Sequence, residues 1–423
     1  MGASDAPGGP LFGDAAAIFS NGIALVIYQH SIGVTPDQIG VMSGALIFCI
    51  AFGALFGGRL GDQFGRRRVF LVTMILIALG SALLTFGTEY PPLLTGVILV
   101  GLATGADLPV SLATIAEAAT DKNRGAILVL SNILWVVGII SAIAIASVVG
   151  GWGRLGGQIL YAQLGAVALV VVLLRFAIPE SELWLESRDE RRRGVETIRA
   201  DKASLRDLLR APYLQPFLAL LAFYALTNLA MNTGGQFSTY VAVNVANIPV
   251  ELFSRVTLVV FTVGLFAGIW FMKVVDTPRR MRYFVAGAML LVAGWAIPAI
   301  LGFNLATLTG SSLLVGIGAD FAFESIMKVW TQESFPTLLR STAQGTIVAF
   351  ARVVGAPLAV LTPALIGAGV RTFYLALAIT MAVGLAIGWL AFHDRMRNEF
   401  DVEQGLDPDT GPQPVRWQTA HPD

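Results

Sequence analysis

The 423 residues are 55% hydrophobic and only 13% charged, whereas soluble domains carry about 25% charged residues. This composition excludes a soluble protein and indicates a polytopic membrane chain, since twelve spans of about 20 residues fit within the length. The 28 basic residues balance the 28 acidic ones, so we expect no nucleic-acid partner. The single cysteine excludes an intrachain disulfide, and the three histidines show no metal-ligand spacing, so we expect no metal site.

Twelve apolar stretches follow one another along the chain, each long enough for a transmembrane helix. They cover residues 11–28, 38–56, 69–86, 93–116, 125–149, 159–178, 217–241, 253–272, 283–301, 306–329, 343–366 and 372–392. We expect no cleavable signal peptide before them. Because the first stretch is short and contains Asp14, we expect an altered or late start of the chain.

The basic residues predict how the spans are oriented. If both termini are cytoplasmic, all but five of the 28 Lys and Arg residues fall in cytoplasmic segments, as the positive-inside rule requires. We therefore expect both termini in the cytoplasm. The segments are an N-terminal six-helix half at 1–178, a cytoplasmic linker at 179–215, a C-terminal six-helix half at 216–392 and a disordered cytoplasmic tail at 393–423.

Several motifs recur in both halves at nearly the same interval. The repeated pairs are 213 to 216 positions apart: Asp62 and Asp276, Glu117 and Glu333, Asp107 and Asp320. Internal repeats are common in transporter folds, whose halves meet at a site near the middle of the membrane. The predicted fold class is an all-α membrane protein of twelve transmembrane helices in two six-helix pseudo-repeats.

Charged residues and glycines gather at the cytoplasmic ends of the spans in both halves. One interpretation is a basic loop that merely follows the positive-inside rule. The other is that carboxylates accept hydrogen bonds from arginines or helix ends and hold the cytoplasmic side in one conformation. The repeat favours a conformational latch, formed by Gly58, Asp62, Gly65, Arg66, Arg67, Glu117, Arg124, Asp276, Arg279, Arg280, Glu333 and Arg340.

Segment 58–68, which reads G-R-L-G-D-Q-F-G-R-R-R, resembles the loop signature of the major facilitator superfamily, G-x-L-x-D-x-x-G-R-R. Segments 105–110, 179–185 and 330–340 are similar to the sugar porter and metabolite:proton symporter branches of that superfamily. The resemblance implies a secondary active transporter that needs no cofactor. It also implies a central cavity lined by spans 1, 4, 7 and 10, and a protein that works as a monomer.

Six charged residues lie within the predicted spans, namely Asp14, Asp107, Asp320, Glu324, Lys328 and Arg352. A charge at a helix centre costs about 2.5 to 3.5 kcal/mol on insertion scales, so it is a functional hypothesis by default. Asp107 has no cation in its own span and is the first candidate for a proton-coupling carboxylate, and Asp14 is the second.

Asp320 and Glu324 are the third candidate site for the proton. With Lys328 they are spaced four apart and share one helix face, where two close carboxylates cannot easily both ionise. The alternative is a pair of static ion pairs, Glu324 with Lys328 and Asp320 with Arg352.

Polar side chains at helical spacing predict the substrate site. On span 7, polar residues recur every four positions from Tyr224 to Gln236. Each amide among them offers both a donor and an acceptor to a substrate. The alternative is that these amides simply hydrogen-bond one helix to another. Arg352 can neutralise a carboxylate of span 10 or bind an anionic substrate. The predicted substrate-binding residues are Asn21, Tyr224, Asn228, Asn232, Gln236 and Arg352.

These features predict a secondary active transporter of the cell membrane that takes up a small polar metabolite together with protons by alternating access. A polyol, a sugar and an organic acid all fit, and the proton gradient replaces any cofactor. The alternatives are a proton-driven exporter on the same fold and a transporter-like nutrient sensor. An enzyme is not expected, because no Ser/His/Asp, metal-ligand or phosphate-cradling arrangement is present.

Overall fold

The computed structural model is all-helical in the part of the chain it describes, which is residues 9–64, 66–118, 124–176, 208–274, 277, 279–335 and 337–393. The first group of helices comprises α1 (Gly9–Ile32), α2 (Pro36–Phe64), α3 (Arg66–Phe86), α4 (Tyr90–Ala118), α5 (Arg124–Val149) and α6 (Arg154–Phe176). Helices form here because an apolar segment in a membrane satisfies its backbone N–H and C=O groups internally. Gly33, with φ of 79°, takes the left-handed conformation that separates α1 from α2.

The second group of helices comprises α9 (Leu214–Asn244), α10 (Val250–Met272), α11 (Arg280–Leu301), α12 (Leu305–Ala322), α13 (Glu324–Ser334) and α14 (Thr337–Phe392). Asn304 caps α12 by accepting a hydrogen bond from the Thr307 backbone N–H at 3.0 Å. The two last predicted spans lie within α14, whose backbone is non-helical at Gly369.

The tenth predicted span is not one helix, which corrects the expectation of a continuous segment at 306–329. The backbone leaves the helical conformation at Phe323, with φ of −121° and ψ of −111°, so α12 ends and α13 begins there. A helical face defined by spacing does not continue through such a break, because the periodicity restarts in the second helix.

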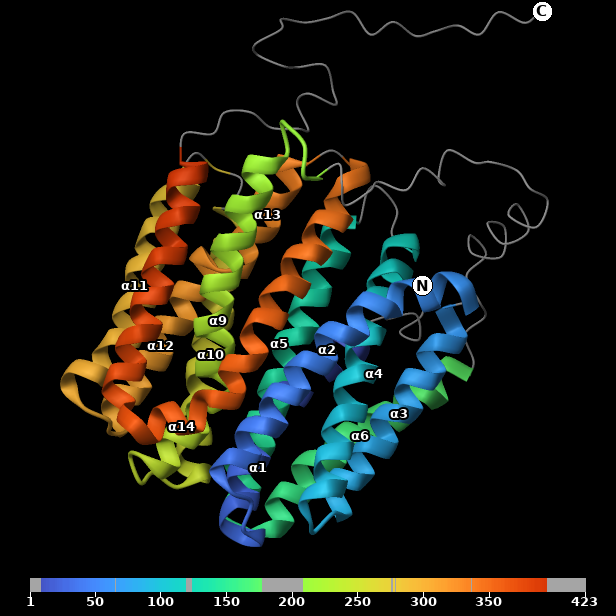
Figure 1. The fold of residues 1–423 in the computed structure, drawn as a ribbon, viewed down its shortest axis with the longest axis vertical. Coiled ribbons are helices and arrows are strands. Elements are labelled where there is room, and N and C mark those ends of the chain that lie inside the picture. The colour runs from blue at the N-terminus through green and yellow to red at the C-terminus, as the bar shows by residue number, and fades with distance from the viewer. Residues whose placement is uncertain are drawn as a thin grey trace, which may run out of the picture.

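Figure 1 shows the two groups side by side, with α1 and α9 near the middle and α3 and α6 at one edge. Glycines let the groups touch. A Cβ at Gly22 of α1 would collide with the backbone carbonyl of Gln236 on α9, and one at Gly40 of α2 would collide with that of Val360 on α14. The backbones of facing helices therefore approach as closely as small residues allow.

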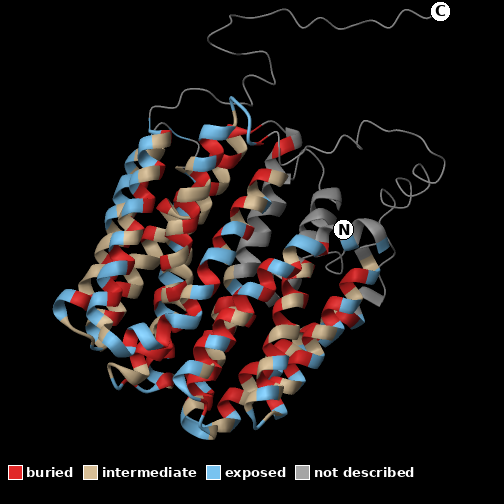
Figure 2. Cartoon of the chain, viewed as in Figure 1, coloured by how far each residue is buried: buried red, intermediate tan, exposed pale blue. Residues whose placement is uncertain are grey.

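The burial pattern is that of a membrane protein, since many of the most exposed side chains are large and apolar. Figure 2 shows that exposed residues recur along the helices from one end to the other. Leu173 is 70% exposed and Leu390 is 66% exposed. Among the described residues eight helices are long and apolar enough to cross a membrane, and two shorter apolar helical stretches add to them, Ala16–Ile32 and Val136–Val149. The outer surface is thus suited to lipid.

Candidate functional site

The polar residues of α9 lie on a helix that contacts both groups of helices. Asn232 donates a hydrogen bond to Asn228 Oδ1 at 2.5 Å, and Gln236 Nε2 lies 3.5 Å from the backbone oxygen of Ser43 on α2. Tyr224 stacks on Phe323 with ring centroids 5.5 Å apart. The four residues predicted on this face therefore reach from the break between α12 and α13 to the contact with α1 and α2.

Asn21 of α1 is buried, and its amide is held in one orientation. Tyr161 of α6 donates a hydrogen bond to Asn21 Oδ1 at 3.0 Å. Asn21 Nδ2, Ser20 Oγ and Gln236 Oε1 are buried without a hydrogen-bond partner among the described residues. A donor and an acceptor thus remain unsatisfied on two helices that touch at Gly22, where an orphaned polar group costs about 1–3 kcal/mol.

Tyr161 and Ser20 were not among the predicted site residues. Tyr161 belongs to the sixth span, which the family resemblance does not place on the cavity, and Ser20 lies beside Asn21 rather than one turn from it. The one available signal was the phenol that Tyr161 places near the start of the sixth span. A buried phenolic hydroxyl usually finds a hydrogen-bond partner.

The α13 helix carries an ion pair. Lys328 Nζ lies 2.8 Å from Glu324 Oε1, and the two side chains are 41% and 37% exposed. The contact between Glu324 and Lys328 is therefore one of the two static ion pairs that the sequence left open.

Asp320 is separated from this ion pair, which corrects the prediction that Asp320 and Glu324 share one helix face. The break at Phe323 ends the periodicity, and Asp320 faces the glycine surface of α10 instead. A Cβ at Gly268 would lie 3.2 Å from Asp320 Oδ1, and one at Gly264 would lie 4.0 Å from Oδ2. Among the described residues no hydrogen bond or ion pair joins Asp320 to another side chain.

Asp107 lies inside the first group of helices. The Thr73 hydroxyl of α3 lies 3.4 Å from Asp107 Oδ1, and Asp107 is 2% exposed. Phe70 and Ala103 are buried in a small apolar cluster on α3, α4 and α6. The side chain thus contacts a neighbouring helix of its own half. Asp14 lies in α1, but its side chain falls outside the described part.

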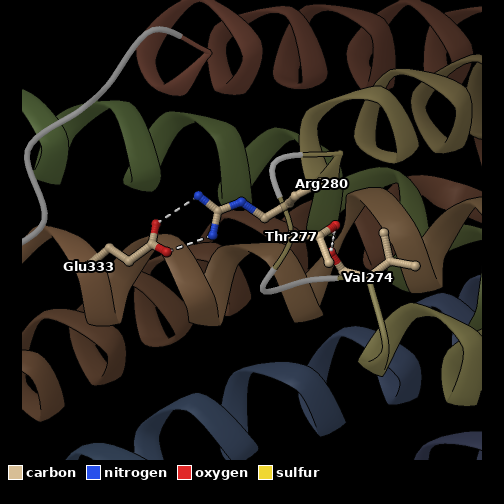
Figure 3. Close-up of polar contacts among 4 residues, drawn as sticks. All are labelled: Val274, Thr277, Arg280 and Glu333. Carbon is tan, nitrogen blue, oxygen red and sulfur yellow. Dashed lines mark hydrogen bonds and ion pairs between the residues drawn. The ribbon is translucent and has the colours of Figure 1, made fainter.

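One pair of the predicted latch is present. Arg280, at the start of α11, donates two hydrogen bonds to Glu333 of α13, at 2.6 Å and 3.1 Å (Figure 3). Both side chains are 26% exposed. This fork joins two helices within the second group, so it stiffens that group rather than tying the groups to each other.

The other latch residues are less informative. Arg279 is exposed and Arg67 is half-buried. Gly65 and Asp276 lie outside the described residues, and nothing is described of the side chains at Gly58, Asp62, Arg66, Glu117, Arg124 and Arg340.

The described residues contain no group of three or more His, Cys, Asp or Glu side chains able to hold a metal ion. What the site offers instead is neutral hydrogen-bonding amides between two groups of helices, and carboxylates at membrane depth. Such groups bind and release a polar solute without making covalent bonds.

Comparisons with known proteins agree with this arrangement. A family model for the Major Facilitator Superfamily matches residues 11–360. The Minor myo-inositol transporter IolF of Bacillus subtilis (strain 168) is 32% identical over 346 residues, which cover 80% of this chain and 78% of that protein. The Inner membrane metabolite transport protein YgcS of Escherichia coli (strain K12) is 25% identical over 399 residues, covering 87% and 86%.

Among solved structures, the inward open conformation of the xylose transporter XylE from E. coli matches with a TM-score of 0.74. Sequence identity is 16%, and the match covers 95% of this chain and 98% of that chain. The likeness shows that the two chains share a fold.

The fold and the polar groups between its halves define a helical membrane transporter rather than an enzyme. The chain belongs to the Major Facilitator Superfamily, which confirms the resemblance found in the sequence. It is a multi-pass protein of the cell membrane with a small-molecule substrate.

Proposed function

We propose that the protein takes up a small polyol together with protons by alternating access of its two halves. The observation that carries the proposal is the uncharged hydrogen-bonding set where α1 meets α9. Asn21 Nδ2 is a buried donor and Gln236 Oε1 a buried acceptor. A hydroxyl both donates and accepts, so a polyol satisfies each of them. The name of the myo-inositol transporter cited above supports the same substrate class.

The charges of the site favour a neutral substrate over an organic acid. Binding a carboxylate needs a cation that is available for a bidentate contact. Lys328 is already paired with Glu324 at 2.8 Å, so its charge is matched. A sugar shares the hydroxyl chemistry of a polyol and is the nearest competitor.

We further propose the topology and energetics that the sequence predicted. The chain has twelve spans, with both termini and the 179–215 linker in the cytoplasm, and works as a monomer without a cofactor. The contacts described between the halves include two hydrogen bonds. Asn244 Nδ2 donates to Gln29 Oε1 at 3.1 Å, and Arg255 Nε donates to the Ser147 carbonyl at 3.0 Å. Both contacts lie near the C-terminal ends of α1, α5 and α9, so we take this conformation to be closed at that end.

The proton is carried by Asp107 or Asp320 in this proposal. Glu324 is the weaker candidate, because neutralising it would leave Lys328 without its partner. Asp320 faces glycines rather than a cation, and Asp107 has no cation within its own span. A carboxylate at membrane depth is most easily kept neutral by protonation.

The test is uptake of radiolabelled myo-inositol, xylose and benzoate into proteoliposomes, with and without an inward proton gradient. We expect gradient-driven accumulation of myo-inositol. Gln236→Ala should abolish it, whereas Gln163→Ala, which removes an amide bonded within the first group to Ser141, should not. Accumulation of benzoate alone would reject the polyol, and outward flow driven by the gradient would indicate an exporter. Binding without accumulation would indicate a sensor.

The same assay separates the carboxylates. The proton-carrying residue, changed to its amide, should lose gradient-driven accumulation while myo-inositol exchange persists. If Asp107→Asn and Asp320→Asn both accumulate normally, the proposal that either carries the proton is wrong.

A further inference from the structure

A groove on the outer face of the first group of helices lies apart from the amides where α1 meets α9. It lies between α2, α3 and α4 and has a volume of about 460 Å³, within the range of roughly 300–1,000 Å³ found for small-molecule sites. Its lining is almost wholly apolar: Phe52, Gly53, Phe56, Leu60, Phe64, Arg68, Val69, Val72, Thr73, Leu76, Leu102, Ala103 and Ala106.

The walls of the groove come from two rows of side chains that face away from the core. On α2, Phe52 and Phe56 lie one turn apart with ring centroids 4.6 Å apart, and they are 47% and 45% exposed. On α3, Val72 is 56% exposed. Both helices include apolar segments long enough to cross a membrane. The groove therefore opens toward the hydrocarbon of the bilayer.

Close packing of α2 on α4 forms the floor. A Cβ at Gly53 would collide with the Leu102 carbonyl, and one at Gly57 would collide with that of Ala106. Without side chains at these two glycines the helices touch, and a channel is left between the aromatic row of α2 and the face of α3. A bulky residue on either glycine would push the floor away.

One end of the groove is basic. Arg68 is exposed, lines the groove and lies in the first turn of α3. Arg67 precedes it, and both belong to the end where the positive-inside rule predicts cytoplasm. A basic residue beside an apolar channel at the membrane surface matches the two parts of an anionic phospholipid, and basic pockets between transmembrane helices bind such head groups.

We propose that this groove binds one anionic phospholipid, with an acyl chain between α2 and α3 and its phosphate on the Arg68 guanidinium. The chain lies against Thr73 and Ala106, and Thr73 is the residue whose hydroxyl meets Asp107. The lipid therefore packs against the contact that positions Asp107, and its removal loosens α3 on α4.

The experiment is native mass spectrometry of the purified full chain titrated with dioleoylphosphatidylglycerol. We expect one tightly retained lipid, bound about tenfold more tightly than dioleoylphosphatidylcholine. Dihexanoylphosphatidylglycerol, which has the same head group and short chains, should not displace it. Equal retention of the two dioleoyl lipids, or displacement by the short-chain lipid, would overturn the proposal.

Two variants with matched controls locate the lipid. Val72→Trp fills the groove from an exposed position and should abolish retention. Leu79→Trp, at another exposed position of α3 (54%) that does not line the groove, should retain the lipid. Arg68→Gln should weaken the binding of phosphatidylglycerol about tenfold. Arg282→Gln, at the exposed start of α11, should leave its binding unchanged.

Thermal unfolding of each variant confirms that it is folded before the lipid is scored. If Val72→Trp unfolds, Arg68→Gln alone decides the proposal. Retention by a folded Val72→Trp variant equal to that of Leu79→Trp would place the lipid elsewhere. The unsubstituted protein could instead show the mass of two chains and the Val72→Trp variant the mass of one. That result would assign the groove to a second copy of the protein and reject the lipid.

Discussion

The contact between α1 and α9 at Gly22 allows a direct test of how this conformation is stabilised. In Gly22→Ala the new Cβ would overlap the Gln236 carbonyl oxygen and lie 3.3 Å from its carbon. Backbone cannot rotate away as a side chain can, so the helices must separate. The closed contact is therefore disfavoured relative to any conformation in which α1 and α9 are apart.

Two effects of the substitution must be weighed to obtain the size of the shift between conformations. Overpacking of this kind costs about 1–3 kcal/mol. Alanine is also the better helix former by about 0.8–1.0 kcal/mol, but α1 is helical whether or not it touches α9, so that gain does not change the balance between conformations. The steric term alone shifts the equilibrium, by about 5- to 150-fold.

The assay is a distance measurement by pulsed electron paramagnetic resonance. Spin labels on Asp37→Cys and Thr372→Cys, both exposed and on opposite halves, report the separation of the halves in a Cys49→Ser background. We expect a longer distance to become populated in Gly22→Ala. Gly235→Ala is the control, since its Cβ would make an ordinary contact 3.8 Å from Phe19. An unchanged distance distribution in a folded Gly22→Ala would refute the reasoning.

Two further predictions concern individual contacts. Because Arg280 and Glu333 are each 26% exposed, solvent screening reduces their forked pair to a coupling energy of about 1 kcal/mol. A double-mutant cycle of Arg280→Gln and Glu333→Gln in thermal unfolding should show it, and additive effects would contradict it. Tyr161→Phe removes the hydrogen bond to Asn21 Oδ1 and should raise the KM for uptake about tenfold, corresponding to 1.4 kcal/mol. Tyr90→Phe at the start of α4 should leave the KM unchanged, and an equal effect of both variants would mean that Asn21 does not contact substrate.

The sequence was informative about features that depend on local composition. Apolar stretches of transmembrane length predicted helices that the structure contains, with α1 running to Ile32 rather than ending at residue 28. The loop motif at 58–68 predicted the family. These features depend on side-chain type and near neighbours, which the chain order specifies.

The candidate site depended on features that spacing does not determine. Asp320 and Glu324 are four residues apart, yet the break at Phe323 directs Asp320 to α10 and leaves Glu324 with Lys328. A break arises from packing against other helices, here including the stacking of Phe323 on Tyr224. No pattern within the span predicted it.

The sequence by itself determined that this is a helical membrane protein of the Major Facilitator Superfamily, because hydropathy, composition and a short loop motif are properties of the linear chain. Only the tertiary structure decided that Asp107 meets Thr73 and that Tyr161 orients Asn21. Those contacts join residues 34 and 140 positions apart. Which buried polar groups become neighbours depends on how helices rotate and approach one another, and that is settled by packing along their whole length.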